Sequence, residues 1–446
     1  MSSKPRSARS WAAVLTLLVA LAAGGCGEEE APLRIGVVVD CVGINRSLKN
    51  PELSGAQLPL IERGARRLGR RPGDGVTAVT VAGRSVELVP GCTEAFEFSM
   101  LTTELRRLAE LEKADAIVAG GTGADEVVVR DVARRHPKTV FMPVVHGPRE
   151  ATLRRNAPNL FRFSGDHGQG IAGLATYAYR ELGWRRAAVV LGNWDAGWLS
   201  RDAFVAEFCA LGGTIADQLG VDFFDPAGRD IDRVPRDVDG VAVFAGQFFG
   251  ASGFLKRLAR RAEEPAREIV AGPALMDDPT ILRATSRALA GVTGSSYVDP
   301  ARIRAYLRDY AKAFPGVPAS IASNELVTGY RDAVEAILRA LERAEGNTER
   351  LPAELRRLHI GLLGGPVRLD DQGQAVVSTS LVRIAAPRGE RTDPVLEPVS
   401  RLDGVDQSVG GLLAPSLSPD AGPAACKRRR PPSWAWPARD TPGRAD

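Results

Sequence analysis

The stretch Lys113–Val145, with the sequence KADAIVAGGTGADEVVVRDVARRHPKTVFMPVV, decides the fold. It predicts a strand, a glycine turn, a helix and a second strand, in that order. Ala116–Ala119 is a short apolar run of the kind buried on both faces of a parallel sheet, and Gly120 and Gly121 end it. Thr139–Val145 is the next apolar run. Such strand–helix–strand units build parallel sheets that are covered by helices.

We expect the turn between these two runs to form part of a ligand-binding site. Thr122 and Asp125 can both cap the following helix, because their side-chain oxygens accept from unpaired backbone amides. Pro137 ends that helix. In an open parallel sheet, ligands bind where strands end and helices begin. We therefore expect Gly121, Thr122 and the segment after Met142 to contribute to a site.

The alternation of apolar strands and amphipathic helices runs through most of the chain and restarts after Leu160. Two candidate crossing segments, Leu160–Ser164 and Gly291–Tyr297, and a closing hairpin over Pro366–Ile384 would connect two sheets. We predict an α/β fold of two doubly wound parallel-sheet lobes joined by a multi-strand hinge. The expected boundaries are 33–160 plus 298–350 for lobe one and 161–297 plus 351–386 for lobe two.

The N-terminus has the features of a targeting segment. Three basic residues precede the apolar run Trp11–Ala23, which is too short to span a bilayer comfortably. The run leads into Ala23-Gly24-Gly25-Cys26, which resembles a bacterial lipobox. We interpret 1–25 as a lipoprotein signal peptide, Cys26 as the lipidated first residue and 26–32 as a tether. The alternative is an ordinary secretory signal with a chance cysteine.

Residues 387–446 form a separate compositional region at the C-terminus. Ala414–Asp446 contain seven prolines and the run Lys427-Arg428-Arg429-Arg430, which indicates a disordered tail. The formal net charge of +4 belongs to the two ends, because residues 26–386 carry equal numbers of acidic and basic side chains. The basic pI is therefore no argument for nucleic-acid binding.

Five cysteines fit an exported protein. Cys41 and Cys92 each follow a predicted strand of lobe one, and we predict that they form a disulfide. Cys209 lies between apolar residues of a predicted helix and is expected to be a buried, inert thiol. Cys426 falls in the predicted tail.

Several motifs together resemble those of the type I periplasmic binding proteins, in the branch of receptors for branched-chain amino acids and amides. The resemblance covers about residues 33–384. It is carried by Leu33-Arg34-Ile35-Gly36-Val37, Gly120-Gly121-Thr122, Asn159-Leu160-Phe161-Arg162, Phe204–Gly213, Gly291-Val292 and Asn324–Ala333 with Tyr330. The family implies a two-lobed clamp that closes on a small solute by hinge bending.

The resemblance also implies which loops face the solute. In this sequence they contain Gly121, Thr122, His146, Trp194, Asp195, Gln247, Phe248 and Asp277. The family usually has Ser/Thr pairs at both lobe-one loops, whereas the second loop here reads Met142–Gly147, MPVVHG. A tyrosine-glycine pair common in lobe two is replaced by Trp194-Asp195-Ala196-Gly197. The expected ligand is therefore a small polar solute: an amino acid, an amide or a related compound.

Some of these residues also have a structural explanation. His146 alone would more often be a packed or solvent-facing histidine, and Asp277 with Asp278 could bind an ammonium group or cap the helix that starts at Pro279. No GxSxG, CxxC, HExxH or convincing carboxylate pair suggests an enzyme, and no ligand spacing suggests a metal or cofactor.

We expect a monomeric, extracytoplasmic, lipid-anchored solute-binding protein that delivers its ligand to the permease and ATPase subunits of an ABC transporter. The resemblance alone implies these transporter partners. The alternative is a receptor lipoprotein of the same fold that senses a ligand and signals to a membrane partner without transport.

Overall fold

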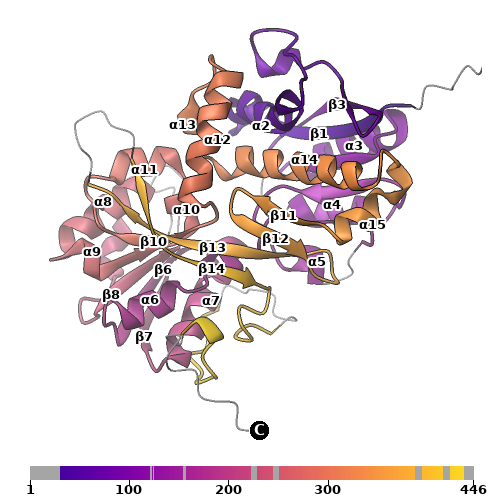
Figure 1. The fold of residues 1–446 in the computed structure, drawn as a ribbon. Helices are drawn as coiled ribbons and strands as arrows, with labels where there is room; N and C mark the ends of the chain where they lie inside the picture. The colour runs from indigo at the N-terminus through magenta and orange to yellow at the C-terminus, as the bar shows by residue number, and fades with distance from the viewer. Residues whose placement is uncertain are drawn as a thin grey trace, which may run out of the picture. The chain divides into compact units, whose positions relative to one another are not determined.

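The computed structural model describes residues 31–120, 123, 125–153, 157–221, 229–244, 251–386, 394–414 and 422–435. The chain divides into a short unit, Met1–Pro32, and a large unit, Leu33–Asp446. Within the described part of the large unit, two sheets form the centres of two lobes (Figure 1). This confirms the predicted α/β fold.

The sheet of lobe one has the strand order β2-β3-β1-β4-β5. Its strands are β1 (Leu33–Asp40), β2 (Val79–Val81), β3 (Arg84–Thr93), β4 (Ala116–Ala119) and β5 (Val140–Pro143). Strands β3, β1, β4 and β5 are parallel, and β2 joins β3 as an antiparallel hairpin. Every residue of β4 and β5 is buried, as expected for parallel strands covered on both faces.

Helices cover both faces of this sheet because neighbouring strand residues point in opposite directions. Val37 packs into the cluster that contains α2 and α14, whereas Val38 packs into the cluster that contains α3 and α4. The helices of this lobe are α2 (Lys49–Glu62), α3 (Phe98–Arg106), α4 (Asp125–Ala133), α5 (Glu150–Leu153), α12 (Pro300–Ala313), α13 (Ala319–Ala322), α14 (Glu325–Arg343) and α15 (Leu351–Arg356).

The sheet of lobe two has the order β11-β12-β13-β10-β9-β8-β6-β7, and β14 pairs with β13. Strands β6 to β10 are parallel where they pair, and β11 to β14 add antiparallel neighbours. The strands are β6 (Arg186–Gly192), β7 (Thr214–Val221), β8 (Gly240–Phe244), β9 (Ile269–Ala271), β10 (Thr293–Ser296), β11 (His359–Leu362), β12 (Gly365–Leu369), β13 (Ala375–Ile384) and β14 (Leu396–Val405).

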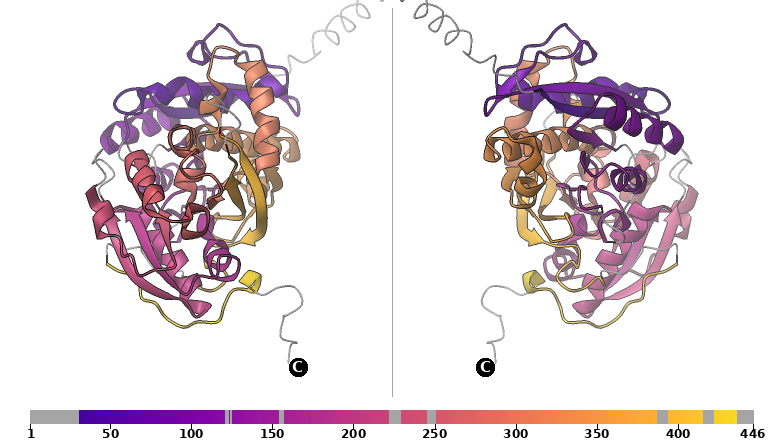
Figure 2. Two further views of the ribbon diagram at one scale, coloured as in Figure 1. Left: turned by 90° about the vertical axis from the view of Figure 1, so that its left-hand side faces the viewer. Right: turned by 90° about the vertical axis from the view of Figure 1, so that its right-hand side faces the viewer.

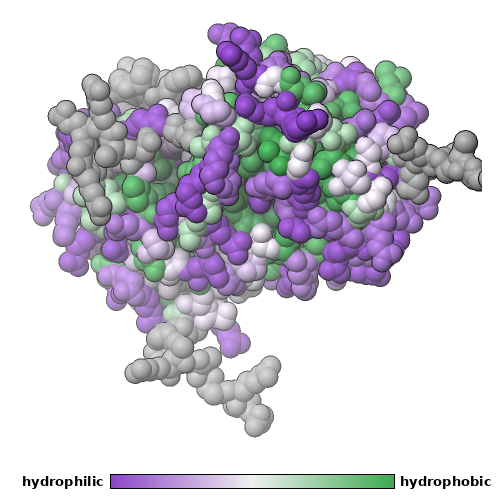
Figure 3. All heavy atoms as spheres, turned by 45° about the horizontal axis from the view of Figure 1, so that its top comes forward, coloured by the Kyte–Doolittle hydropathy of each residue, from purple (hydrophilic) through white to green (hydrophobic). Residues whose placement is uncertain are grey.

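Two layers of helices flank this second sheet. Phe204 and Phe208 of α7 pack on one face, and Phe254 of α8 packs on the other. The helices are α6 (Leu174–Arg180), α7 (Asp195–Ala210), α8 (Ala251–Arg261), α9 (Pro265–Glu268), α10 (Pro273–Met276) and α11 (Pro279–Thr285). In the view of Figure 3 the surface is mostly polar, and the apolar residues gather toward the middle of that face.

Helix α6 begins after Gly173, which adopts a left-handed conformation with φ of 84° and separates the helix from a 3-10 turn. Helix α15, expected in lobe two, packs against α14 and therefore lies with lobe one.

The described part of the C-terminal region is ordered, so the prediction of a wholly disordered tail over 387–446 is wrong. Strand β14 pairs along β13, and Ala424 exchanges backbone hydrogen bonds with the side chain of Gln218 in β7. Trp434 donates its indole N–H to Glu207 of α7, at 3.1 Å. Figure 2 shows this yellow segment running along lobe two.

A disulfide fastens the same segment. Cys209 of α7 is bonded to Cys426, with their Cα atoms 5.5 Å apart. Cys209 is thus not the inert thiol that the sequence suggested. The hydrophobic side of its helix favours burial, but burial does not distinguish a thiol from a half-cystine.

Candidate functional site

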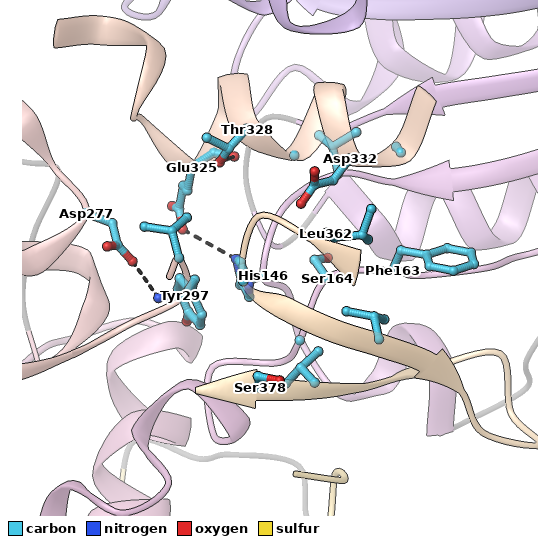
Figure 4. Close-up of a pocket in the computed structure, with 18 of the residues that line it drawn as sticks. His146, Phe163, Ser164, Asp277, Tyr297, Glu325, Thr328, Asp332, Leu362 and Ser378 are labelled. Atoms are coloured by element: carbon cyan, nitrogen blue, oxygen red, sulfur yellow. Dashed lines mark hydrogen bonds and ion pairs between the residues drawn. The ribbon is translucent and has the colours of Figure 1, made fainter. Parts of the chain in front are cut away.

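The two lobes meet where His146 contacts Tyr297. His146 follows β5 of lobe one, and Tyr297 follows β10 of lobe two. Their rings are stacked, with centroids 3.2 Å apart and planes inclined by 10° (Figure 4). Glu325, the first residue of α14, lies beside them, with its Oε2 3.7 Å from Nδ1 of His146. Strand ends from both sheets therefore converge on one small region.

The position of Tyr297 is fixed from several sides. Its backbone N–H donates to Asp277 Oδ2 at 2.8 Å, and its hydroxyl lies 3.2 Å from Nδ1 of His167. Gly170 leaves room for the ring, because a Cβ atom at that position would overlap it. Tyr297 is consequently held by lobe two while its ring reaches the loop of lobe one.

Asp277 has a structural role at the end of β10. Its Oδ1 accepts from the Ser296 hydroxyl at 2.5 Å, and its Oδ2 accepts from Tyr297 N–H. Burial raises the pKa of Asp277 to about 7. The neighbouring Asp278 caps α11, because its side chain accepts from Thr280 and Ile281 N–H groups. Of the two roles considered for Asp278, the cap is the one the structure contains.

Two cavities flank Tyr297 and Glu325. The first, of about 50 Å³, is lined by Pro143, Val144, His146, Phe163, Ser164, Gly165, Asp277, Tyr297, Val298, Ser323, Glu325, Thr328, Gly329, Asp332, Ala333, Leu362, Gly364, Val367, Val377 and Ser378. The second, of about 40 Å³, is lined by His167, Trp194, Ala196, Gly197, Ser200, Phe244, Gly272, Pro273, Ala274, Tyr297 and Glu325. Each has room for only a few water molecules, so a larger solute needs the two to join.

A buried ion pair holds the crossing segment 160–164 in place next to the loop of lobe one. Arg162 forms an ion pair with Glu126 of α4, and both side chains are fully buried. The same guanidinium donates to the carbonyl of Pro148 and to Thr152 of α5. A buried pair of charges is stable only when hydrogen bonds satisfy its remaining atoms, as they do here for the arginine. These bonds fix the loop that carries His146.

A second buried network ties the C-terminal segment to the hinge. Arg149 Nε lies 3.3 Å from Asp166 Oδ2, and its guanidinium also donates to the backbone carbonyl of Gln407. The Gln407 side chain donates to Thr152 Oγ1 at 3.0 Å and to Asp166 Oδ2 at 3.2 Å. Residues from beyond β14 thus complete the polar interior that lies next to His167.

The two histidines of the site are neutral near pH 7. Burial lowers the pKa of His146 below its ordinary value and outweighs the opposing effect of Glu325. Burial also lowers the pKa of His167 to about 4. Neither ring therefore brings a positive charge to the cavities at neutral pH.

Four of the eight residues predicted to face the ligand are among the residues that the structure describes. His146 and Asp277 line the first cavity, and Trp194 lines the second. Asp195 begins α7 and lies close to Gly123 of lobe one, since a Cβ built on Gly123 would be 3.4 Å from Asp195 Oδ2. Gly121, Thr122, Gln247 and Phe248 lie outside the described residues, as does the predicted lipidation site Cys26.

Sequence reasoning missed Tyr297, Glu325 and His167. Tyr297 ends a segment that was predicted to cross between the lobes, which was a usable signal. Glu325 follows Asn324, whose side chain caps α14 by accepting from Leu326 N–H. That cap marks the helix start, but it does not indicate that the helix start faces a cavity.

Cys41 and Cys92 are joined in the structure, with Cα atoms 5.5 Å apart. Val39 pairs with Cys92 in the parallel ladder between β1 and β3, so the two cysteines lie at the same sheet edge as the cavities. Among the described residues, no group of three His, Cys, Asp or Glu side chains could hold a metal ion. Within the same ranges, no helix has the length and apolar character needed to cross a bilayer.

Comparison with known proteins identifies the family. A family model described as periplasmic binding protein matches residues 32–390, and the chain belongs to this family. This confirms the resemblance seen in the sequence. A comparison with curated proteins finds no match.

Solved structures share the fold at low sequence identity. An ABC transporter substrate-binding protein from Sphaerobacter thermophilus is 23% identical, with a TM-score of 0.71 over 84% of this chain and 99% of that chain. A solute-binding protein from R. palustris, in complex with 4-hydroxybenzoate, is 16% identical, with a TM-score of 0.69 over 85% and 99%. LivJ from Streptococcus pneumoniae, in complex with isoleucine, is 15% identical, with a TM-score of 0.62 over 83% and 100%.

Proposed function

We propose that this protein is the extracytoplasmic solute-binding component of an ABC transporter. It captures a small polar solute between its lobes and delivers it, as a monomer, to permease and ATPase subunits. The observation that carries the proposal is the contact between His146 and Tyr297, which brings strand ends of both lobes to one pair of cavities beside Glu325. Family membership and the solute-bound R. palustris and LivJ structures support this function.

The proposed binding surface combines predicted and observed residues. Tyr297 and Glu325 line both cavities and form its centre. The surrounding surface is assigned to Gly121, Thr122, His146, Trp194, Asp195, Gln247, Phe248 and Asp277. Trp194 offers a flat apolar wall, and Thr122 offers a hydroxyl group. A clamp binds tightly when both lobes contribute contacts in its closed state.

A thermal-shift screen tests solute binding first. Amino acids, amides, ureas and short acids are added to the purified chain, and a true ligand raises the unfolding temperature because it binds the folded state alone. Trp194→Ala and Thr122→Ala should each weaken binding about tenfold or more with little change in unliganded stability. If no compound of any class stabilises the protein, the solute-binding proposal is wrong.

Transport and sensing are separated by a second measurement. The protein is added with its hit compound to membrane vesicles that contain the cognate permease and ATPase, and uptake of radiolabelled compound is followed. ATP-dependent uptake that requires the protein supports transport. Binding without uptake, with a ligand-dependent change in a membrane partner, supports the sensing receptor instead.

We also propose that Cys26 carries the lipid anchor of the mature protein. Two or more acyl chains suffice for stable membrane attachment. Cys26→Ser should release the protein into the soluble fraction, whereas Cys426→Ser should leave it with the membrane. A Cys26→Ser protein that stays membrane-bound with its N-terminal segment intact would contradict the anchor.

A further inference from the structure

We propose that the solute is a cation: a compound with a protonated amine, amidine or guanidine group and no carboxylate. The inference rests on the proposed solute-binding function and names the chemical class of its ligand. It is carried by the charges, the hydrogen-bond donors and the aromatic faces of the residues that line the two cavities (Figure 4).

The charged side chains that line the cavities are acidic. Glu325 lines both, and Asp277 and Asp332 line the first. No lysine or arginine lines either cavity among the residues that the structure describes. Near the Glu325 carboxylate, an anionic solute would therefore meet like charge, whereas a cation would meet opposite charge.

Three hydroxyl groups that line the first cavity already donate within the protein. Ser164 donates to the Val145 carbonyl at 2.6 Å, and Ser378 donates to Asp403 Oδ1 at 2.7 Å. Thr328 donates to the Glu325 carbonyl at 3.1 Å. A hydroxyl carries one proton, so these three groups offer a solute oxygen lone pairs rather than donors. That arrangement suits an N–H-rich ligand.

The nearest buried arginines each pair with an acidic side chain. Arg162 is paired with Glu126, and Arg149 is paired with Asp166. Arg331, which adjoins Asp332, pairs with that aspartate at 2.8 Å. The low pKa values of His146 and His167 keep both rings uncharged at neutral pH.

Aromatic rings border the same space. Tyr297 separates the cavities, and Trp194 lines the second one beside Glu325. A cation placed over a tyrosine or tryptophan face is attracted by the ring quadrupole, most strongly where water is excluded. A planar cation between these rings would place its N–H groups toward the Glu325 carboxylate. An ammonium, amidinium or guanidinium group satisfies this arrangement.

Matched pairs of probes test the charge directly. Benzamidine and benzoate have nearly the same shape and opposite charges, and leucinamide and leucine differ by the loss of one carboxylate. Calorimetry on the full chain at neutral pH should show benzamidine binding at least tenfold more tightly than benzoate, and leucinamide more tightly than leucine. Benzoate or leucine binding as tightly as its cationic counterpart would overturn the inference, while solute binding itself would stand.

A pair of variants tests whether Glu325 is responsible for the preference for a cation. Glu325→Gln should reduce the affinity for benzamidine about tenfold or more, because the isosteric amide removes the charge. Glu349→Gln, an exposed glutamate at another helix start, is the matched control and should bind as the unmodified chain does. A Glu325→Gln protein that melts normally and keeps full cation preference would contradict the assignment. If none of the four probes binds and the wider screen also yields no ligand, the proposed function fails.

Discussion

His146 of lobe one stacks on Tyr297 of lobe two, with ring centroids 3.2 Å apart. The two residues are separated in sequence by most of lobe two, and each follows the end of a strand. Their contact therefore exists only while the lobes are close together. Because both cavities border Tyr297, movement of this ring is the step that would join them.

Removing the Tyr297 ring should favour the open clamp. Tyr297→Ala deletes an aromatic contact of roughly 1 kcal/mol, which would change the ratio of closed to open molecules about fivefold. Small-angle scattering should show a larger radius of gyration without added solute. Tyr297→Phe keeps the ring and loses the hydroxyl next to His167, so it should scatter like the unmodified protein. Identical curves for all three proteins would exclude a closing role for the ring.

Asp277 and His167 should give opposite pH dependences of stability. Burial raises the pKa of Asp277 from 3.8 to about 7, so between about pH 4 and 7 the folded state keeps a proton that the unfolded chain releases. The contribution of Asp277 to stability therefore falls as pH rises through that window. Burial lowers the pKa of His167 from 6.5 to about 4, so its contribution rises with pH between about 4 and 6.5.

Urea unfolding at several pH values tests the predicted direction of both pH dependences of stability. Relative to the unmodified chain, Asp277→Asn should gain stability as pH rises from about 4 to 7, by on the order of 2 kcal/mol. His167→Gln should lose a similar amount between about pH 4 and 6.5. Differences that do not change with pH would mean that neither burial effect operates.

Gln407 should matter for stability although it lies beyond the family match. Its side chain bonds Thr152 and Asp166 in a fully buried network. Gln407→Leu leaves Asp166 Oδ2 with fewer donors and should cost roughly 1–3 kcal/mol of unfolding free energy. Gln372→Leu, at an exposed turn, is the matched control and should change stability little. Equal effects in the two variants would argue that the C-terminal segment contributes nothing to the hinge.

The Cys209–Cys426 disulfide should hold the C-terminal segment against lobe two. It closes a loop with a sequence separation of 217, for which its loss should cost roughly 2–4 kcal/mol. In Cys426→Ser, trypsin should cleave the exposed run Lys427–Arg430 faster than in the unmodified protein. Cys41→Ser removes the other disulfide and should leave this cleavage rate unchanged. Equal cleavage in all three proteins would contradict a fastening role.

The core strands could be predicted because an apolar run between polar turns indicates a buried strand. Ala116–Ala119 is a four-residue apolar run between polar turns, and it is the buried strand β4. Strand β7 was missed because Thr214–Val221 lies at a sheet edge, is partly exposed and has polar Asp217 and Gln218 in its middle. Strand β14 was missed for the same reason, since most of its residues face solvent and it contains Pro398. Edge strands take their structure from a neighbour, which local sequence does not reveal.

The site could be predicted only in part. His146 was found because it follows a strand whose end must lie at the ligand-binding edge. Glu325 was not, because its place beside His146 depends on how α14 packs against lobe one. The pairing of Cys209 with Cys426 depends likewise on the path of a proline-rich segment that has no strong periodicity. Contacts set by long-range packing leave no local pattern in the chain.

We propose that a cationic solute binds between the lobes at Tyr297 and Glu325. The most direct test is a crystal structure of the chain with benzamidine, or with the strongest cationic hit of the screen. We predict ligand density in contact with the Tyr297 ring and the Glu325 carboxylate, with contacts from both lobes. Ligand density at another place, or a carboxylate ligand held between the lobes at this site, would contradict it.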